Sequence, residues 1–456
     1  MRVMILSANF FQLPYPVYPL GASAAAELAR QNGHQARLVD LLADNQFSGG
    51  YDPARLAAHI NEFQPDCLGL SLRNLESADS SDAGEDWSLD ILKSLVAELR
   101  RLTKAPLVLG GAGFSLMPEQ VLRLSGADYG LPGEGEEIWP AFLNELNAGR
   151  ARPGLQPASG PVARQLAAYY DPDLVRAYDA AGGLIGVQSK RGCPLNCLYC
   201  SYPLLEGRRI RPRPAAEVLD DLRFLARHLD SPQVAFADAV FNDPRGYWRE
   251  LLEALASSGL KIRWTAFFQP AELSREDLRL IKASGASGLE FGTDGACDAT
   301  LAGLNKPFRF DLVRRLQENC RAAGVPAAHY IIFGGPGENE ATVEEGLRNL
   351  EELRDGVVFA AAGLSVYPRT PLFDLAFREG LVPADGCLDR PLFYFSPQLA
   401  PARLDARLRR AFGARRDRLY PANRAAEQTR ALRRLGFRGI LWDTLIGAGT
   451  RRGRRA

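Results

Sequence analysis

The chain has 456 residues, a formal net charge of +1, and 46% hydrophobic and 24% charged residues. This length is too great for one ordinary core, so two or three domains are expected. The near-zero charge argues against a nucleic-acid partner, and no run of about 18 apolar residues is present to span a bilayer. No secretory signal precedes the first apolar run, "VMILSAN", so a cytoplasmic protein is expected, in which clustered cysteines indicate metal or redox chemistry.

Residues 1–148 alternate short apolar runs with helical patterns. Strands are predicted over residues 3–9, 36–42, 66–74, 105–112 and 127–135, and helices over residues 21–33, 52–63 and 89–102. This βαβα alternation predicts a doubly wound, Rossmann-like domain, a parallel sheet with helices on both faces. Ligands of such folds bind beyond the carboxyl ends of the strands.

Polar residues and glycines follow three of these strands. They are Arg73 and Asn74 after the third strand, Gly110, Gly111 and Gly113 after the fourth, and Glu134 and Gly135 after the fifth. Glycine lets the backbone approach a bulky ligand, although it also serves an ordinary strand–helix turn. Because three corresponding strand ends share this feature, we expect a ligand-binding edge there.

A second alternating series follows a Pro- and Gly-containing connector at residues 149–182. Between residues 183 and 384, strands are predicted over residues 183–192, 233–241, 262–268, 287–295, 327–338 and 361–368. Six βα units predict a partial (βα)6 barrel, since a complete barrel has eight. Residues 385–456 are expected to form a small, Arg-rich and mostly helical C-terminal segment.

Three of the seven cysteines lie in one loop, "KRGCPLNCLYCSYP", with the spacing Cys193-x3-Cys197-x2-Cys200. A structural zinc site and an ordinary four-iron cluster each take four protein ligands, and no histidine is local. Three thiolates leave one metal position open, which suits a catalytic site. A zinc knuckle or redox pair remains the alternative. The other cysteines are predicted to be core thiols (Cys67, Cys297 and Cys320) and a loop thiol (Cys387).

This spacing, after the first strand of a βα barrel, resembles that of the radical S-adenosylmethionine (radical SAM) superfamily. The resemblance implies a 4Fe–4S cluster on the three cysteines, with S-adenosylmethionine (SAM) bound to the open iron. In that family one electron from the cluster cleaves SAM to methionine and a 5′-deoxyadenosyl radical. An electron donor such as flavodoxin or ferredoxin is therefore expected.

Further motifs resemble those of the same barrels and imply a SAM site. The residues concerned are Tyr199 beside the third cysteine, Asp238 in "FADAVFN", Glu290 in "GLEFGTDG", and Gly334 and Gly335 in "FGGPGE". For each of them a structural role is the alternative. One departure is Arg369, which stands where many relatives have glycine and could alter the substrate side of the pocket.

The first domain, placed before such a barrel, resembles that of the cobalamin-binding radical SAM enzymes, called class B when they methylate. "GLSLRN", "GGAGFS" and "LPGEGE" carry this resemblance. The familiar Asp-x-His-x-x-Gly signature is missing, because the first loop, "ANFFQLPYPVYPLG", has no histidine. Either cobalamin binds without a protein ligand on its lower face, or the domain has lost it. Arg73 is the candidate to approach that face without ligating cobalt, and pairing with a carboxylate is its alternative.

The expected function is cobalamin-dependent radical SAM methyl transfer to an unactivated carbon of a small molecule, natural-product or lipid-like. Alternatives are a cyclase, rearrangement or oxidation enzyme with the same cofactors, and a cobalamin-binding sensor. Modification of tRNA is disfavoured because no basic RNA-binding module is present. The C-terminal stretch "ALRRLGFRGILWDTLIG" suggests either peripheral membrane contact or packing against the barrel.

Overall fold

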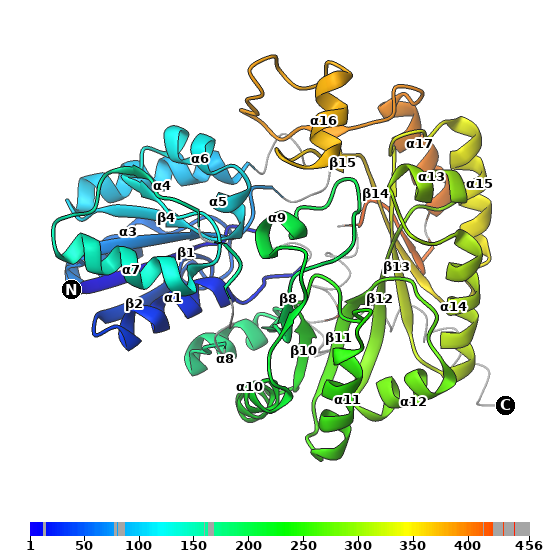
Figure 1. The fold of residues 1–456 in the computed structure, drawn as a ribbon, viewed down its shortest axis with the longest axis horizontal. Helices are drawn as coiled ribbons and strands as arrows, with labels where there is room; N and C mark the ends of the chain where they lie inside the picture. Colours follow the sequence, from blue (N-terminus) through cyan, green and yellow to red (C-terminus); the bar gives the residue numbers. More distant parts are fainter. Residues whose placement is uncertain are drawn as a thin grey trace.

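The structure, a computed structural model, describes residues 1–11, 15–76, 80, 87–158, 160–162, 168–413, 415–422, 432 and 442. Two α/β units lie side by side, one built from the first third of the chain and one from the remainder (Figure 1). No helix among the described residues is both long and apolar enough to cross a membrane.

The first unit is a six-stranded parallel sheet in the order β2-β1-β3-β4-β5-β6. The strands are β1 (Arg2–Ala8), β2 (Gln35–Asp40), β3 (Cys67–Leu72), β4 (Leu107–Gly110), β5 (Tyr129–Gly130) and β6 (Gly154–Leu155). Six consecutive residues of β1 are buried, as expected of a strand covered on both faces. The sixth strand comes from residues that the sequence analysis placed in the connector, because a two-residue strand has no readable periodicity.

Helices cover both faces of this sheet, which confirms the doubly wound prediction. One face carries α1 (Leu20–Gln31) and α7 (Gly135–Asn147), and the other carries α3 (Pro53–Phe63), α4 (Ser88–Leu102) and α6 (Pro118–Ser125). The short helices α2 (Leu41–Asp44) and α5 (Ala112–Leu116) follow β2 and β4 directly. The side chain of Asp52 caps α3 through the backbone N–H groups of Ala54 and Arg55, with Pro53 in the first turn.

The second unit is a seven-stranded parallel sheet in the order β17-β14-β13-β12-β11-β10-β7, a partial barrel as predicted. Its strands are β7 (Gly186–Val187), β10 (Gln233–Phe236), β11 (Arg263–Phe268), β12 (Ala286–Asp294), β13 (Ala327–Phe333), β14 (Val357–Ala362) and β17 (Arg418–Leu419). The seventh strand, β17, belongs to the C-terminal segment, follows helix α17 (Pro401–Phe412), and was not predicted.

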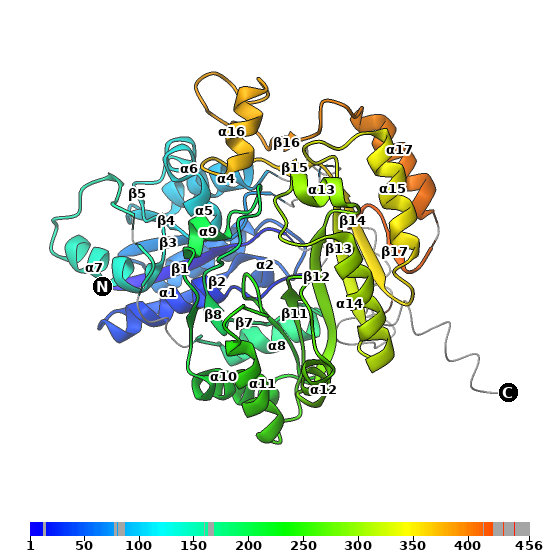
Figure 2. The same cartoon turned by 45° about the vertical axis from the view of Figure 1, so that its right-hand side comes forward.

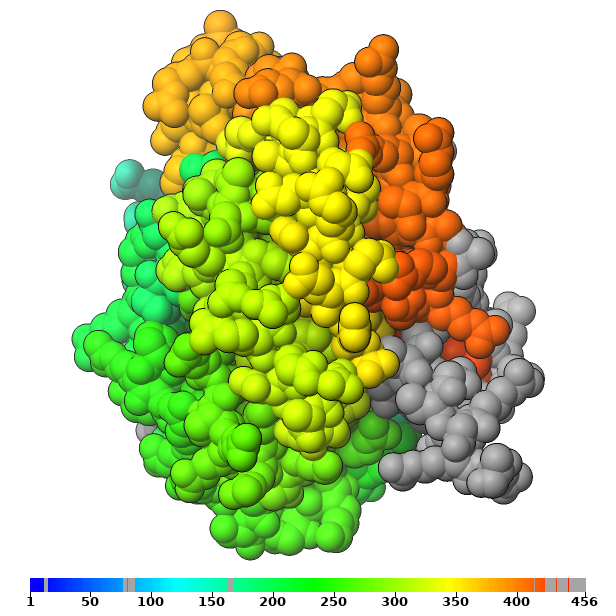
Figure 3. Space-filling model, turned by 90° about the vertical axis from the view of Figure 1, so that its right-hand side faces the viewer, coloured from blue at the N-terminus to red at the C-terminus, as the bar shows by residue number. Residues whose placement is uncertain are grey.

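The barrel strands point alternate side chains outward into a helical layer and inward to the concave face. On β11, for example, Trp264 and Phe268 join the outer core, whereas Thr265 and Phe267 point inward. The outer helices are α8 (Pro172–Ala180), α10 (Ala215–His228), α11 (Tyr247–Ser257), α12 (Arg275–Ala283), α14 (Phe310–Ala323) and α15 (Glu340–Glu351). Figures 2 and 3 show this layer continuing through α15 to α17 on the outer face.

Short elements connect the carboxyl ends of the barrel strands. They are helices α9 (Tyr202–Glu206), α13 (Asp298–Gly303) and α16 (Pro371–Arg378), and the antiparallel pairs β8 (Lys190–Arg191) with β9 (Arg211–Pro212) and β15 (Leu364–Ser365) with β16 (Phe393–Tyr394). Helix α9, directly after the cysteine loop, lies against α5 of the first unit (Figure 1). The two units therefore meet where the cysteines are.

The loop after β1 forms a second joint between the units. Residues 12–14 of this loop lie outside the described residues, but Val17 pairs in parallel with Leu184, just before β7. Tyr18 is buried against Tyr170 and Tyr178, with ring centroids 5.6 and 5.7 Å apart. This part of the loop connects the two sheets.

The C-terminal segment reaches the concave face of the barrel through Trp442. Its indole is 8% exposed and packs with Ala328, Val357, Phe359 and Leu419. A Cβ at Gly288 would lie 2.6 Å from Cη2 of Trp442, so the ring occupies space that only glycine leaves open on β12. For this residue, packing against the barrel is the observed arrangement.

Candidate active site

The cysteine loop begins with a backbone turn that requires glycine. Gly192 has φ +92°, and a Cβ there would lie 2.1 Å from the carbonyl oxygen of Arg209. Its N–H donates to Glu206 Oε2 at 3.0 Å, and the N–H of Cys193 donates to Gly207 O at 3.0 Å. The start of the loop is thereby fixed against the end of α9 and the residues that follow it.

The far side of the loop is held by two other segments. The N–H of Leu198 donates to Leu304 O at 3.1 Å, and Leu198 O accepts from the N–H of Leu372 at 3.0 Å. Asn305 Nδ2 donates to the carbonyl oxygen of Asn196 at 2.6 Å. The loop therefore has a fixed backbone, as a preorganised ligand set requires.

The three free thiols of the loop fit the ligand set of a four-iron cluster with one open iron. All seven cysteines are free, and no three His, Cys, Asp or Glu side chains in the described part of the chain converge on one ion. A four-iron cluster takes each thiolate on a different iron, so its ligands do not need to converge. Burial raises the pKa of Cys193 and raises that of Cys200 to about 12, so a metal is needed to hold them as thiolates.

Each of the four histidines has a partner elsewhere. His34 contacts the amino group of Met1, His59 contacts Asp44, His228 contacts Phe224 O, and His329 contacts Thr293 and Gln317. None of these partners belongs to the cysteine loop. A fourth ligand from histidine is therefore not part of this arrangement.

Tyr199 lies beside two charged residues that the sequence analysis did not select. Its hydroxyl donates to Asp294 Oδ2, and Asp294 forms an ion pair with Lys306. Lys306 Nζ is 3.5 Å from the oxygen of Gly292 and its side chain is 7% exposed. Asp294 lies at the carboxyl end of β12, within "GLEFGTDG", and this position could have identified it as a site residue from the sequence. No feature of the sequence around Lys306, "LNKP", indicated that it belongs to the site.

Asp238 is enclosed by protein donors. It accepts from the backbone N–H groups of Ser189 (2.7 Å) and Lys190 (3.2 Å) and from Lys190 Nζ (3.2 Å), and its side chain is fully buried. Asn242 makes paired bonds with the backbone of Gln269, each of 2.8 Å. The contacts of Asp238 hold the segment that leads into the cysteine loop and favour its structural alternative.

Glu290 lies on the concave face of β12. Its carboxylate accepts from Thr265 Oγ1 at 3.1 Å, Tyr330 Oη at 3.2 Å and Trp442 Nε1 at 3.3 Å. Burial raises its pKa above the ordinary value.

An aromatic row lies on the same face. The ring centroids of Phe267 and Tyr330 are 5.2 Å apart, and those of Tyr330 and Phe359 are 5.1 Å apart. Phe267, near the carboxyl end of β11, is 43% exposed. The row thus presents an accessible apolar ring at one end of the concave face.

The "FGGPGE" motif folds back on itself. The N–H groups of Gly334 and Gly335 both donate to Glu338 Oε2, and burial raises the pKa of Glu338 to about 7. Gly334 has φ +94°, and a Cβ there would lie 2.9 Å from Phe395 Cδ1. The glycines are explained by this turn, whether or not a ligand approaches.

In the first unit, the ends of β3 and β4 are brought together as predicted. A Cβ at Gly111 would lie 2.5 Å from Leu72 O, and a Cβ at Gly113 would lie 3.0 to 3.1 Å from the backbone of Arg73 and Asn74. Gly110 has more room, with Leu131 O at 3.7 Å. The glycines thus permit α5 to start directly against the residues that end β3.

Arg73 has no hydrogen bond or ion pair with any other residue of the described ranges. Burial lowers the pKa of its guanidinium, and the groups that raise it are the phenols of Tyr202, Tyr178 and Tyr15. Tyr202 begins α9, directly after the cysteine loop. The charge of Arg73 is therefore held between the two units without a carboxylate from the described residues.

The carboxylate of Glu134 is bound by residues of the barrel unit. It accepts from Arg211 Nη1 and from the N–H of Val162, both at 2.8 Å, and Arg191 Nη1 lies 3.4 Å away. Arg191 also pairs with Glu136 at 2.7 Å. Gly135 begins α7 with open space around its Cα. Glu134 therefore joins the two units.

Arg369 forms a further contact between the two units. It adopts φ +67°, a conformation that glycine tolerates, and Nη2 donates to Ser115 O at 2.7 Å at the end of α5. Tyr367 Oη donates to Glu76 Oε1 at 2.8 Å, beyond β3. Together with Glu134, these contacts hold the carboxyl edge of the first sheet against the barrel.

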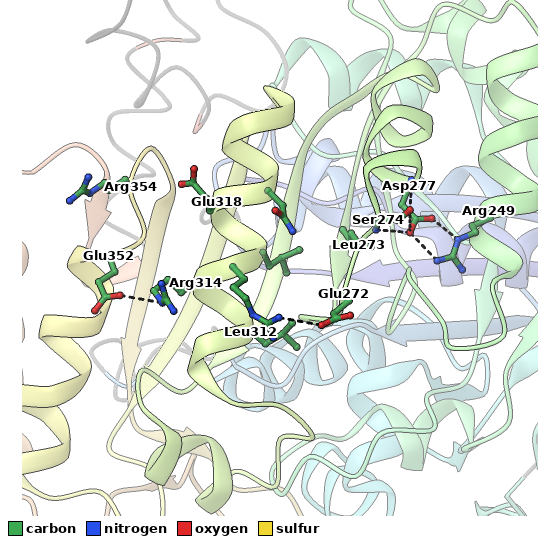
Figure 4. Close-up of a pocket in the computed structure, with 13 residues that line it drawn as sticks. Arg249, Glu272, Leu273, Ser274, Asp277, Leu312, Arg314, Glu318, Glu352 and Arg354 are labelled. Carbon is green, nitrogen blue, oxygen red and sulfur yellow. Dashed lines mark hydrogen bonds and ion pairs between the residues drawn. The ribbon is translucent and has the colours of Figure 1, made fainter.

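A cavity of about 1050 Å³ lies elsewhere, on the outer face between α12 and α14 (Figure 4). Its charged residues pair with one another, as Arg249 with Asp277 at 2.6 Å and Arg314 with Glu352 at 3.4 Å. No cysteine lines this cavity. It is an open groove between helices, separate from the cysteine site.

Comparisons with known proteins agree with this arrangement. The B12 binding domain family matches residues 7–143, and the Radical SAM superfamily matches residues 187–350. The tryptophan 2-C-methyltransferase of Streptomyces laurentii is 23% identical over 445 residues, covering 80% of this chain and 73% of the relative. The cytidylyl-2-hydroxyethylphosphonate methyltransferase of Streptomyces wedmorensis is 22% identical over 504 residues, covering 92% and 91%.

A solved structure shares the whole fold. The radical S-adenosylmethionine methyltransferase TsrM from Kitasatospora setae, with cobalamin and a 4Fe–4S cluster bound, superposes with a TM-score of 0.83 at 22% identity. The match covers 98% of this chain and 97% of that one. With a B12 binding domain before a radical SAM domain that contains the cysteine loop, the chain belongs to the cobalamin-binding radical SAM enzymes.

Proposed function

We propose that this protein is a cobalamin-dependent radical SAM methyltransferase that transfers a methyl group to an unactivated carbon of a small molecule. The observation that carries the proposal is the position of the cysteine loop. Helix α9 after the loop contacts α5 at the ligand edge of the first sheet, and Arg191 before the loop pairs with Glu136 of that edge at 2.7 Å. A cluster on the loop and a corrin on the edge would therefore be neighbours.

The residues present fit these groups. Cys193, Cys197 and Cys200 would hold the cluster, and Arg73, Asn74 and the glycines after β4 would border the cobalamin. When bound, the groups supply an electron for SAM cleavage and a carrier for the methyl group. The chain itself fixes the loop, places the charge of Arg73 between the units and covers part of the concave face with Trp442.

The substrate would lie at the mouth of the barrel. Phe267 offers an exposed ring beside Tyr330, and Glu290 lies on the same face, which suits an apolar or flat natural-product-like or lipid-like molecule. Relatives named for hopanoid and bacteriochlorophyllide methylation, each 26% identical over about half of this chain, act on molecules of that kind. Flavodoxin or ferredoxin would deliver the electron.

The test is anaerobic reconstitution of the full chain with iron, sulfide and hydroxocobalamin, followed by absorption spectroscopy and a SAM-cleavage assay. Replacing Cys193, Cys197 and Cys200 together by alanine should abolish the cluster absorption and SAM cleavage. Cys387→Ala, at a half-exposed thiol outside the loop, is the control and should change neither. Retention of both signals in the triple variant would refute the cluster assignment.

Cobalamin should bind base-off, one molecule per chain, without a nitrogen ligand from the protein. All four histidines have partners away from the ligand edge. Electron paramagnetic resonance of bound cob(II)alamin should lack the nitrogen splitting of an axial ligand. A protein that binds no cobalamin would refute methyl transfer, and a product without an added methyl group would favour the cyclase or rearrangement alternative.

A further inference from the structure

Lys306 is a buried cation held against the cysteine loop. It follows α13, its side chain is 7% exposed, and it forms an ion pair with Asp294, whose side chain is 9% exposed. Its Nζ also lies 3.5 Å from Tyr199 Oη and 5.6 Å from the centroid of that ring. The amine is a cation, paired with the carboxylate of Asp294.

Lys306 lies against the cysteine loop at Cys197. It is a hydrogen-bond partner of Cys197, and the two residues before it contact Asn196 and Leu198, on either side of that cysteine. The nearby Arg208 is exposed and donates to Leu195 O and Asn196 Oδ1. Among the described residues, Lys306 is thus a cation that reaches Cys197 from a site shielded from water.

Neighbours of Lys306 hold the loop without adding charge. The preceding residue, Asn305, donates to Asn196 O at 2.6 Å, and Leu304 O accepts from the N–H of Leu198 at 3.1 Å. Three consecutive residues therefore contact the loop, and only one of them is ionised. Geometry and charge can be separated by mutation at adjacent positions.

We propose that Lys306 is a positioning residue that raises the reduction potential of the cluster held by Cys193, Cys197 and Cys200. Reduction adds a negative charge to the cluster, and a nearby buried ammonium stabilises the reduced form more than the oxidised form. Hydrogen bonds to the sulfurs and the net charge near a cluster set its potential in the same direction. This inference rests on the proposed function, because it requires the cluster.

The test is a redox titration of the reconstituted full chain, followed by electron paramagnetic resonance without SAM, so that catalysis is not involved. Lys306→Met should shift the midpoint potential to a more negative value, because the charge is lost. Lys306→Arg keeps the charge and should remain close to the wild type. Asn305→Ala removes a loop contact at constant charge and serves as the matched control, with little shift expected.

Asp294→Asn offers a test in the opposite direction. It removes a negative charge beside the same loop while leaving Lys306 in place, so the midpoint potential should become more positive. This variant decides the question if Lys306→Met fails to assemble a cluster, and a potential unchanged from the wild type would then overturn the proposal.

Two further results would also overturn it. One is an intact cluster with an unchanged potential in Lys306→Met. The other is an equal shift in Asn305→Ala, which would assign the effect to loop geometry. A wild-type protein that assembles no cluster would instead refute the proposed function, and cluster absorption distinguishes that failure from the first two.

Discussion

Arg73 carries a charge at the end of β3 that no carboxylate of the described residues neutralises. The ionisable groups that act on its charge are the phenols of Tyr202, Tyr178 and Tyr15. If the guanidinium faces bound cobalamin, its fixed charge favours the electron-rich state of the cofactor by about 1 to 4 kcal/mol without ligating cobalt. We predict that Arg73→Ala still binds cobalamin but is harder to reduce, with Arg73→Lys intermediate. The midpoint potential of bound cobalamin measures this, and an unchanged value together with unchanged turnover would make Arg73 structural.

Asp40 should make stability depend on pH. Burial raises its pKa from 3.8 to about 6, and it accepts from Tyr178 Oη at 3.0 Å and from the N–H of Ala43 at 2.8 Å. Because the folded state holds this proton more tightly, the stabilising contribution is full below about pH 4 and is lost as the pH rises through 6. The loss amounts to about 3 kcal/mol.

The measurement is the melting temperature of the wild type minus that of Asp40→Asn. This difference should fall between pH 4 and pH 6 and stay level above pH 7. Asp66→Asn is the control of opposite sign, because the backbone N–H of Arg2 holds the pKa of that carboxyl below its ordinary value. A difference for Asp40→Asn that does not vary with pH would contradict the assignment.

At the scale of elements, Trp442 and strand β12 are matched in shape. The indole fills the space above Gly288 and donates to Glu290. Trp442→Ala should reduce the free energy of unfolding by about 3 to 5 kcal/mol. Trp442→Phe should reduce it by less, since phenylalanine still places an aromatic ring in this space. Thermal unfolding of the purified variants measures both.

A double-mutant cycle tests the contact itself. Gly288→Ala should destabilise the wild type, because the added Cβ would lie 2.6 Å from the indole. In the Trp442→Ala background the same substitution should cost less, since the indole is absent and Pro326 O, at 3.2 Å, is the close contact that remains. Additive effects of the two substitutions would show that Trp442 does not occupy this position in solution.

At the scale of the whole molecule, buried ion pairs hold the two units together. Arg211 and Arg191 of the barrel share Glu134 of the first unit. Arg211→Met leaves Glu134 partly unpaired and should cost about 3 kcal/mol. Limited proteolysis should then cut the connector at residues 149–182 faster than in the wild type. Arg150→Met, which breaks the exposed pair with Glu145, is the control and should not change the cleavage rate.

The sequence by itself determined the local features of this protein. Apolar runs such as "VMILSAN" specify buried strands, and the alternation of strands and helices specifies parallel sheets, because only crossover helices connect parallel neighbours. The three-cysteine spacing and the glycines after β4 were readable for the same reason, since ligand sets and tight turns are built from residues close in the chain. Cys67, Cys297 and Cys320 are core thiols, as predicted from their apolar surroundings, each with 0% exposure.

Only the tertiary structure decided which of these residues meet. Glu134 and Arg211 are 77 residues apart, and Glu290 and Trp442 are 152 apart, so no periodicity connects them. Asp238 was selected through the resemblance of "FADAVFN" and Glu134 through its place after a strand, and the fold supplies each with protein donors. Lys306 was missed because a lysine in a polar loop looks solvated until the cysteine loop is folded against it. Burial and long-range charge pairing depend on how distant segments pack, and that information is not local.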